Sequence, residues 1–404
     1  METPWTGILL QRRCSVSQGA VHKKAAGEDS IQVARRFFDK TILSGSTEER
    51  EKMINISGID EVLISADSHV IEPSEILKER VPKEFRDAAP LFPKLKVGES
   101  FQDHPGGSIP GERLKEMATD GVSAEVLYPT HLLGVFGMDD VRLQQACFRA
   151  YNDWLIDYIS VAPDRLVGIA AISIYDVDHA VAELERCAKA GMKGSIIWQA
   201  PHPDLPFRSS HYDKFWAASQ DLNMPVSLHI LTGHGYHKNP EYFTGRGVEN
   251  YRGSVNMKMD EIANATFDLI CYGVLERFPK LRFLSVENEV GWAPFYLQQW
   301  DYYYRRFLSK NPLPIKKDPS EYFNSQIYCT FFRDAVGGHM FEWWGQDNCM
   351  WSNDYPHQNS TWPNSKRYIE RNLGHLPAET RRKLLSTNAE KLFGLDVQKL
   401  AKAA

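Results

Sequence analysis

From about residue 61 onward, short runs of apolar and β-branched residues alternate with longer segments whose apolar residues recur every three or four positions. The short runs are typical of strands buried on both faces, and the longer segments are typical of amphipathic helices. Eight strands are predicted, the first beginning at Glu61 and the others at 124–128, 166–171, 194–198, 225–231, 280–286, 327–331 and 348–352. The helices predicted between them lie at 141–158, 177–190, 211–222, 257–278 and 293–308, and further helices close the chain.

The alternation of strand and helix predicts a parallel sheet with helical crossovers. The number and shortness of the strands favour a closed (β/α)8 barrel. An open doubly wound sheet is the alternative, but the G-x-G-x-x-G turn that such a fold often carries after its first strand is absent from this sequence. We therefore expect an α/β protein built as a distorted (β/α)8 TIM barrel.

Two long connections and an amino-terminal segment stand apart from this pattern. Residues 72–120 follow the first strand and are rich in proline, and a Gly-, Tyr- and Asn-rich segment at 233–252 follows the fifth. Connections of this length are usually functional, often as covers over a site. Residues 1–57 are polar, with helical spacing at 31–42, and we expect them to form a partly mobile helical arm. Residues 58–404 would then form the barrel.

Composition and charge narrow the classes of partner. The 404 residues are 43% hydrophobic and 25% charged, and the formal net charge is −5, which gives no electrostatic case for nucleic acid or an anionic membrane. The six cysteines are scattered, no apolar run approaches a membrane span, and the first ten residues do not resemble a signal peptide. We expect a cytoplasmic protein that binds a small molecule, and we expect it to form a homodimer.

Polar side chains gather at the predicted carboxyl ends of the strands, where a barrel of this kind carries its active site. Asp67 and His69 end the first strand, and alternation along the strand points both to the same side. The ends of later strands carry His131, His202, His229, Glu287, Arg333, Asp354 and His357. Any single acid or histidine there could instead cap a helix or bind backbone. Taken together, Asp67, His69, His229 and Asp354 favour a shared cation, because carboxylate oxygen and imidazole nitrogen suit zinc, manganese or iron.

Several segments resemble the amidohydrolase superfamily, specifically the amidohydrolase-related branch that includes the carboxymuconate-semialdehyde and resorcylate decarboxylases. The matching segments are Ala66–Pro73, Gly121–Pro129, Pro225–His229, Glu289–Pro294, Ser352–His357 and Asn388–Phe393. The resemblance implies a barrel in which Asp67, His69, His229 and Asp354 bind a metal ion. It also implies that Asp354 serves as acid and base on an attacking water.

At the end of the sixth predicted strand the sequence departs from the family pattern, because the decarboxylases usually carry a histidine where this chain has Glu287. A glutamate cannot replace a proton-donating imidazole near pH 7 unless its pKa is strongly raised. We therefore expect a metal-dependent hydrolase acting on an ester, thioester, lactone or amide. Non-oxidative decarboxylation of an aromatic or muconate-like acid is the alternative, and a catalytically silent binding protein is a third hypothesis. The candidate catalytic residues are Asp354, Glu287, Arg333 and His357.

Aromatic residues near the strand ends predict a largely apolar substrate, since loop residues such as Phe136 would be hard to bury without a ligand or lid. The predicted substrate-binding residues are His131, Trp198, His202 and Tyr236, with His131 or Arg333 holding an anionic end. We expect one metal ion rather than two, because the four ligands are complete for one. A second ion would need further donors, of which Glu287 is the foremost candidate to ligate or bridge.

Overall fold

The structure is a computed structural model, and it describes residues 58–93, 104–233, 248 and 251–403. Within these residues, eight strands form one sheet in the order β1 to β8, and each pairs in parallel with its neighbour in the sequence. The strands are β1 Leu63–His69, β2 Val122–Tyr128, β3 Leu166–Ala171, β4 Gly194–Ile197, β5 Val226–His229, β6 Phe283–Val286, β7 Ile327–Phe331 and β8 Cys349–Trp351. The predicted (β/α)8 barrel is confirmed. The predicted amino-terminal arm lies outside the described residues.

The barrel closes between β8 and β1 through backbone hydrogen bonds made just beyond the end of β8. The N–H of Asp354 donates to the carbonyl oxygen of Asp67 at 3.1 Å, and the N–H of His69 donates to that of Tyr355 at 2.6 Å. The seam of the barrel is therefore formed by the same segments that carry three of the predicted site residues.

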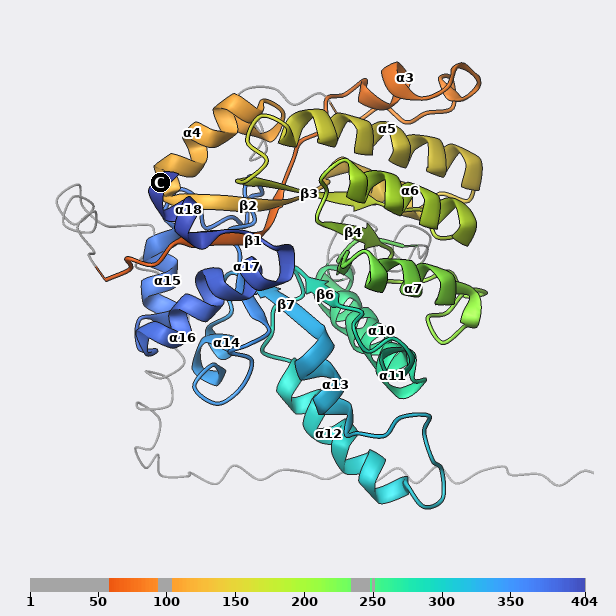
Figure 1. Ribbon diagram of the computed structural model, residues 1–404, viewed down its shortest axis with the longest axis vertical. Helices are drawn as coiled ribbons and strands as arrows, with labels where there is room; N and C mark the ends of the chain where they lie inside the picture. The colour runs from red at the N-terminus through yellow and green to blue at the C-terminus, as the bar shows by residue number, and fades with distance from the viewer. Residues whose placement is uncertain (1–57, 94–103, 234–247, 249–250, 404) are drawn as a thin grey trace, which may run out of the picture. The chain divides into compact units, whose positions relative to one another are not determined.

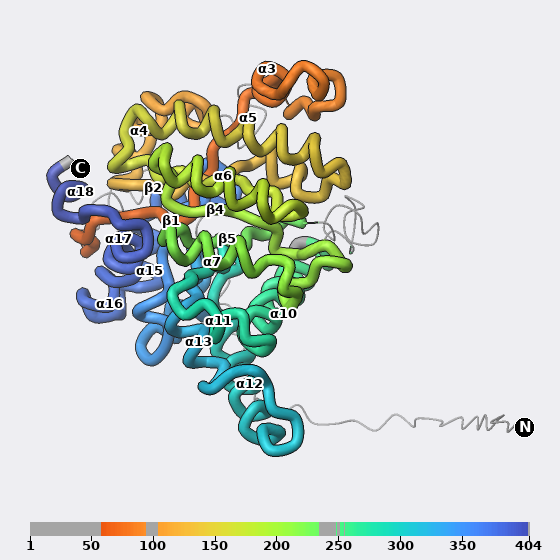
Figure 2. The backbone as a smooth tube through the Cα atoms, turned by 45° about the vertical axis from the view of Figure 1, so that its right-hand side comes forward, coloured from red at the N-terminus to blue at the C-terminus, as the bar shows by residue number. Residues whose placement is uncertain are grey.

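Helices lie around the outside of the strands (Figure 1), and the tube view shows the same arrangement turned by 45° (Figure 2). Every residue of the eight strands is buried, because side chains fill the barrel on one face and helices cover the other. The main helices are α4 Pro110–Asp120, α5 Val141–Ile159, α6 Val177–Lys189, α7 Asp213–Asp221, α10 Lys258–Cys271, α11 Val274–Arg277, α12 Ala293–Phe307 and α13 Pro319–Gln326. They are followed by α14 Ala335–Met340, α15 Ser365–Leu373, α16 Ala378–Arg382, α17 Asn388–Phe393 and α18 Val397–Ala403.

Local sequence explains where several helices begin and end. Asp140 and Asp176 cap α5 and α6 by accepting backbone N–H groups of the first turn. The single helix predicted at 257–278 is instead two, α10 and α11, separated at Gly273, whose φ of 74° lies in the left-handed region. A Cβ at this glycine would lie 2.6 Å from the carbonyl oxygen of Pro314, so a side chain does not fit there.

The two long connections emerge from the carboxyl ends of β1 and β5. The described part of the first holds helix α3 Ile76–Arg80 and two short 3-10 turns before α4, and the second enters α10 through a π-helical turn, η6 Arg252–Met257. Among the described residues, no helix combines the length and the apolar character needed to cross a membrane.

Candidate metal centre

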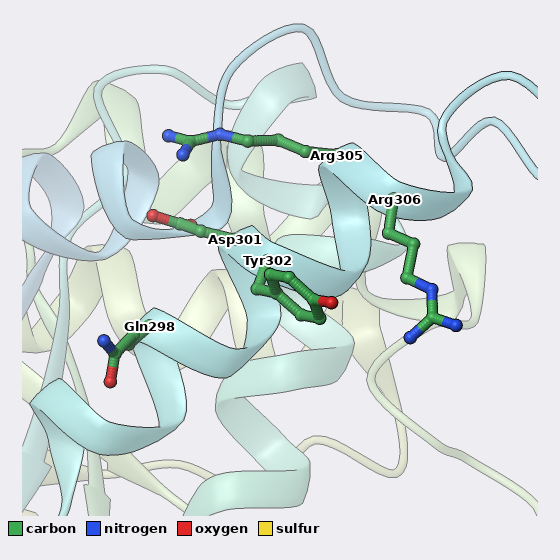
Figure 3. Close-up of a pocket in the computed structure, with 5 residues that line it drawn as sticks. All are labelled: Gln298, Asp301, Tyr302, Arg305 and Arg306. Atoms are coloured by element: carbon green, nitrogen blue, oxygen red, sulfur yellow. The ribbon is translucent and has the colours of Figure 1, made fainter.

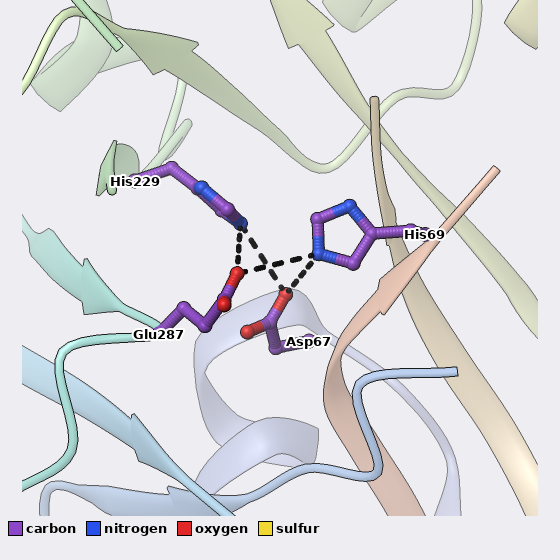
Figure 4. Close-up of side chains that lie close together, drawn as sticks. All are labelled: Asp67, His69, His229 and Glu287. Carbon is purple, nitrogen blue, oxygen red and sulfur yellow. Dashed lines mark ion pairs between the residues drawn. The ribbon is translucent and has the colours of Figure 1, made fainter. Parts of the chain in front are cut away.

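Four side chains from the ends of three strands converge on one point inside the barrel (Figure 4). Asp67 and His69 come from the end of β1, His229 is the last residue of β5, and Glu287 follows β6. The Nε2 atom of His229 lies 3.7 Å from Oδ1 of Asp67 and 3.5 Å from Oε2 of Glu287. The Nε2 atom of His69 lies 3.5 Å from the same Asp67 oxygen. Strand alternation thus does point Asp67 and His69 to the same side, as expected from the sequence.

Asp354 and His357 extend this cluster on the β8 side. Oδ1 of Asp354 lies 3.5 Å from Nε2 of His69 and 2.9 Å from Nδ1 of His357. The imidazole rings of His69 and His357 pack with their centroids 3.9 Å apart. One potential donor atom each from His69, Glu287, Asp354 and His357 lies within 4.8 Å of the other three, and the same holds for Asp67, His69, His229 and Glu287.

The two central imidazoles are oriented by backbone carbonyls. Nδ1 of His69 lies 2.8 Å from the carbonyl oxygen of Pro129, and Nδ1 of His229 lies 2.8 Å from that of Ile230. Because a carbonyl oxygen can only accept, Nδ1 carries the proton in both rings. In the neutral rings, each Nε2 therefore offers a lone pair to the centre of the cluster, which is the arrangement of a metal-binding histidine.

The atoms that face the centre have no hydrogen-bond partner among the described residues. This holds for both carboxylate oxygens of Asp67, Oδ2 of Asp354, and the Nε2 atoms of His69 and His229, all of them buried. The separations of 3.5–3.8 Å between Nε2 atoms and carboxylate oxygens are too long for hydrogen bonds. They match the spacing of neighbouring ligands that each lie roughly 2.1 Å from one ion. This mixed nitrogen and oxygen donor set fits a divalent zinc, manganese or iron ion.

The electrostatics of the cluster also call for a cation. Burial, and then the Asp67 charge, hold the pKa of Asp354 well above its usual range, and burial together with Asp354 raises the pKa of Glu287 to about 8. Burial opposes charge on His229, but the nearby Asp67 carboxylate outweighs it and raises the pKa of His229 to about 9. Burial lowers the pKa of His69 well below its usual value. A divalent ion at the centre would neutralise the acids in place of these protons.

The backbone at Glu287 and Asp354 is strained. Their φ angles are 61° and 53°, in the left-handed region that non-glycine residues rarely adopt. At Glu287, neighbouring side chains hold both backbone polar groups: the N–H donates to Oγ1 of Thr330 at 3.0 Å, and Nζ of Lys258 donates to the carbonyl oxygen at 3.1 Å. Sequence reasoning missed Thr330 and Lys258, because their contacts depend on the turn after β6.

A buried polar network lies behind β1 and the end of β8. Oδ1 of Asn353 accepts hydrogen bonds from Ser65 at 2.9 Å and Ser68 at 2.8 Å, while its Nδ2 donates to Glu125 at 3.0 Å. Arg113, which is fully buried, pairs with Glu125 and donates from Nη1 to the carbonyl oxygen of His69 at 2.7 Å. The network fixes the backbone of the residues on either side of the seam, and the sequence analysis did not single out any of its members.

Other predicted site residues lie at the edge of the cluster or away from it. The ring of His131 stacks on Phe92 with centroids 5.5 Å apart, and its buried Nε2 has no hydrogen-bond partner among the described residues. His202 lies in the loop after β4, where its Nδ1 accepts the backbone N–H of Asp204. Arg333 is exposed, donates to the carbonyl oxygen of Ser360 at 2.8 Å and stacks on Tyr368. Tyr236 lies outside the described residues.

Two aromatic residues expected at the mouth belong to the hydrophobic core instead. Trp198 is 1% exposed and packs edge-on against Tyr175, with ring centroids 4.8 Å apart. Phe136 is also 1% exposed, because a short 3-10 helix, η4 His131–Gly137, turns it onto Phe148 of α5. Both side chains are therefore already packed against protein neighbours, and contact of Trp198 with a substrate stays a prediction.

A surface pocket of about 820 Å3 lies along α12, apart from this cluster (Figure 3). It is lined by Gln298, Asp301, Tyr302, Arg305 and Arg306. Within the protein, Arg305 contacts Asp318, Asp301 accepts from Ser320, and the Arg306 guanidinium stacks on Phe307. The chemistry of the molecule is therefore expected at the strand ends.

Comparison with known proteins identifies the family. Residues 64–395 match the model of the amidohydrolase family, and the chain belongs to this family. It is 26% identical over 347 residues to gamma-resorcylate decarboxylase from Rhizobium sp. (strain MTP-10005), a match that covers 78% of this chain and 96% of that protein.

Two solved structures share the fold. An amidohydrolase from Mycobacterium avium subsp. paratuberculosis K-10 superposes with a TM-score of 0.68 at 18% identity, covering 83% of this chain and 100% of that one. A 5-carboxyvanillate decarboxylase from Novosphingobium aromaticivorans DSM 12444, complexed with manganese and 4-hydroxy-3-methoxy-5-nitrobenzoic acid, superposes with a TM-score of 0.64 at 21% identity. That match covers 83% of this chain and 97% of the other.

These comparisons correct the expected hydrolytic activity. Two relatives that each match over 347 residues are gamma-resorcylate decarboxylases, which agrees with the alternative and not with the hydrolase. The hydrolase prediction was wrong: it rested on Glu287 alone, which stands where the decarboxylases usually carry a histidine, and the likeness to decarboxylases outweighs that single departure.

Proposed function

We propose that this protein is a metal-dependent, non-oxidative decarboxylase of a hydroxylated aromatic carboxylic acid. The observation that carries the proposal is the likeness to gamma-resorcylate decarboxylase, which extends over 78% of this chain and 96% of that protein. The unpartnered donor atoms of Asp67, His69, His229 and Asp354 support a metal-dependent reaction. Manganese is the proposed metal, because fold neighbours are described with bound manganese.

The overall reaction replaces a carboxylate by a proton: the bond between the ring carbon and the carboxyl carbon breaks, carbon dioxide leaves, and the ring carbon gains a proton. The metal ion, when bound to Asp67, His69, His229 and Asp354, would supply Lewis acidity that orients the acidic substrate. The chain itself must supply the proton. General acids of this kind typically contribute about 10²–10⁴-fold to the rate.

Glu287 is the acid that we assign to this step. It is 9% exposed, whereas the four proposed metal-binding residues Asp67, His69, His229 and Asp354 are fully buried. A substrate that enters the barrel mouth can therefore reach Glu287, together with the partly exposed His357. His357 joins Asp354 to Thr130, with Nδ1 2.9 Å from Oδ1 of Asp354 and Nε2 3.1 Å from the threonine hydroxyl. This arrangement can pass a proton between the loop and the cluster.

The test is a panel of hydroxylated aromatic acids that includes 2,6-dihydroxybenzoate and 5-carboxyvanillate, incubated in deuterium oxide with the protein and Mn²⁺. We expect carbon dioxide release from at least one acid and one deuterium in the product at the carbon that lost the carboxylate. Glu287→Gln should lower kcat about 10²–10⁴-fold. No carbon dioxide from any acid of the panel would count against the proposed function.

The number of metal ions is tested by the same variant. We propose one ion, with Glu287 outside its coordination, so wild type and Glu287→Gln should each bind one equivalent of Mn²⁺. Two equivalents in wild type that fall to one in the variant would favour a two-metal site with a bridging Glu287. Homodimer formation and cytoplasmic location stay proposals, and light scattering of the purified protein tests the first.

A further inference from the structure

Glu72, three residues beyond β1, inserts its carboxylate into the loop that follows β2. The residue is 1% exposed. Oε1 accepts backbone N–H groups of Thr130 at 3.2 Å and Leu132 at 3.1 Å, and Oε2 accepts that of His131 at 3.0 Å. Three consecutive N–H groups at the start of η4 thus point at one carboxylate, an arrangement that favours a negative charge.

The loop held by Glu72 contacts the candidate metal centre at two points. The carbonyl oxygen of Pro129 lies 2.8 Å from Nδ1 of His69 and sets the tautomer of that ring. The hydroxyl of Thr130 lies 3.1 Å from Nε2 of His357. His357 in turn contacts Asp354 and packs on the His69 ring. The position of residues 129–132 therefore determines how two histidines of the cluster are oriented.

We propose that Glu72 is a positioning residue that holds residues 129–132 in the conformation that orients His69 and His357 toward the cluster. It is not a catalytic residue, because both of its oxygens are occupied by backbone N–H groups away from solvent. Packing alone would be satisfied by an apolar side chain. Burying an acid instead is unfavourable, and burial raises the pKa of this carboxyl group to about 7. What the carboxylate adds is two oxygens that accept from three donors at once.

The test is Glu72→Gln in the full chain, measured first by titration with Mn²⁺. The amide retains one oxygen acceptor but turns an NH2 group toward an N–H donor, so the loop should shift. Outer-shell partners of metal-binding histidines typically affect metal affinity about 10–100-fold, and we expect the Mn²⁺ dissociation constant to rise by that factor. An unchanged dissociation constant in a folded variant would overturn the inference.

A matched control is Glu183→Gln. Glu183 is also a buried carboxylate with several donors, but its partners Asn152 and Arg186 lie on α5 and α6, in the helical layer. We expect this variant to lose stability and to keep the wild-type affinity for Mn²⁺. An equal loss of affinity in Glu183→Gln would show that general destabilisation explains the effect, and would overturn the positioning role.

Two further measurements test the inference if Glu72→Gln does not fold or if no metal binds. Glu72→Asp keeps the charge but has a side chain that is one methylene shorter, so it should also weaken Mn²⁺ binding. If this variant binds Mn²⁺ with the wild-type affinity, charge alone matters and the inference is overturned. A crystal structure of either folded variant should show His69 and His357 rotated, and unchanged rings would overturn it without any metal.

The inference rests on the proposed function only for its interpretation in catalysis. Mn²⁺ titration requires no turnover, so a wild-type protein that binds Mn²⁺ but decarboxylates none of the test acids would count against the proposed function alone. Where turnover is measurable, Glu72→Gln should lower kcat more than it changes KM, since the variant disturbs the cluster and not the substrate contacts.

Discussion

The backbone N–H of Asp354 donates to the carbonyl oxygen of Asp67, so that two fully buried carboxylates are fixed side by side where the barrel closes. Neither oxygen of Asp67 has a hydrogen-bond partner among the described residues, and Asp354 has His357 beside it, with Nδ1 2.9 Å from Oδ1. Two buried like charges repel strongly, because the surrounding protein screens them far less than water does. The closing seam of the barrel is therefore electrostatically unfavourable unless a cation lies between the two strands.

This arrangement predicts that the metal stabilises the fold. Removal of metal with a chelator should lower the Tm, and addition of Mn²⁺ should restore it. At a free concentration 100 times the dissociation constant, binding adds about 2.7 kcal/mol to the free energy of unfolding. Differential scanning calorimetry measures both changes. The variant carrying Asp67→Asn and Asp354→Asn should lose this dependence, and a wild-type Tm insensitive to chelator would contradict the prediction.

Thr330 should control the strained backbone of Glu287. In Thr330→Val the side chain keeps its shape but no longer accepts the Glu287 N–H, which leaves a buried donor unsatisfied at a cost of about 1–3 kcal/mol. We expect a lower Tm and a lower kcat. Thr330→Ser keeps the hydroxyl and is the control, expected to stay close to wild type. If both variants retain the wild-type kcat, Thr330 does not act on Glu287.

Phe136 should behave as a core residue. It is a buried residue of η4, and the centroid of its ring lies 4.5 Å from that of Phe148. Phe136→Ala should therefore reduce the free energy of unfolding by about 3–5 kcal/mol while KM for the substrate stays unchanged. Denaturant unfolding measures the free energy of unfolding, and steady-state kinetics measure KM. A raised KM in a variant of normal stability would instead place this ring at the substrate.

Asp120 should make stability depend on pH. Its carboxyl group accepts the backbone N–H of Ser365 at 2.9 Å, and burial raises its pKa to about 7. The unfolded chain releases the proton near pH 4, so the folded state binds more protons between about pH 4 and 7, and stability falls as pH rises through that range.

Asp120→Asn removes this titration. The free energy of unfolding of the variant relative to wild type should increase from pH 5 to pH 8, as measured by urea unfolding at each pH. A difference that is constant over this range would mean that Asp120 titrates at its ordinary pKa in the folded protein.

Much of the architecture follows from local pattern. The prediction for α5, 141–158, differs from the observed Val141–Ile159 by one residue, because apolar spacing and the Asp140 cap agree. Strand alternation correctly predicted that Asp67 and His69 point to the same side. Because the carboxyl ends of parallel strands meet at one rim, His229 and Asp354 could also be expected to lie close to them. These relationships depend on periodicity and strand order, both of which the sequence carries.

The rest depends on loop geometry that no periodicity encodes. Glu72 reaches the loop after β2 only because of the path taken beyond β1, and Thr330 accepts from Glu287 only because that residue adopts a positive φ. Phe136 looked like a loop residue, but a 3-10 turn buried it. The pKa of Glu287 likewise depends on neighbours brought together by the fold.

The seam between β1 and β8 also has a consequence for biosynthesis. Asp67 and His69 leave the ribosome early, whereas Asp354 and His357 emerge nearly 300 residues later. Until then, the buried histidines and acids of the nascent barrel lack both the partners that close the site and the strand that shields it. A site that includes Asp354 can therefore be completed only after β8 has been made, and a chain interrupted before β8 would expose an incomplete, acid-lined opening to the chaperones and proteases of the cell.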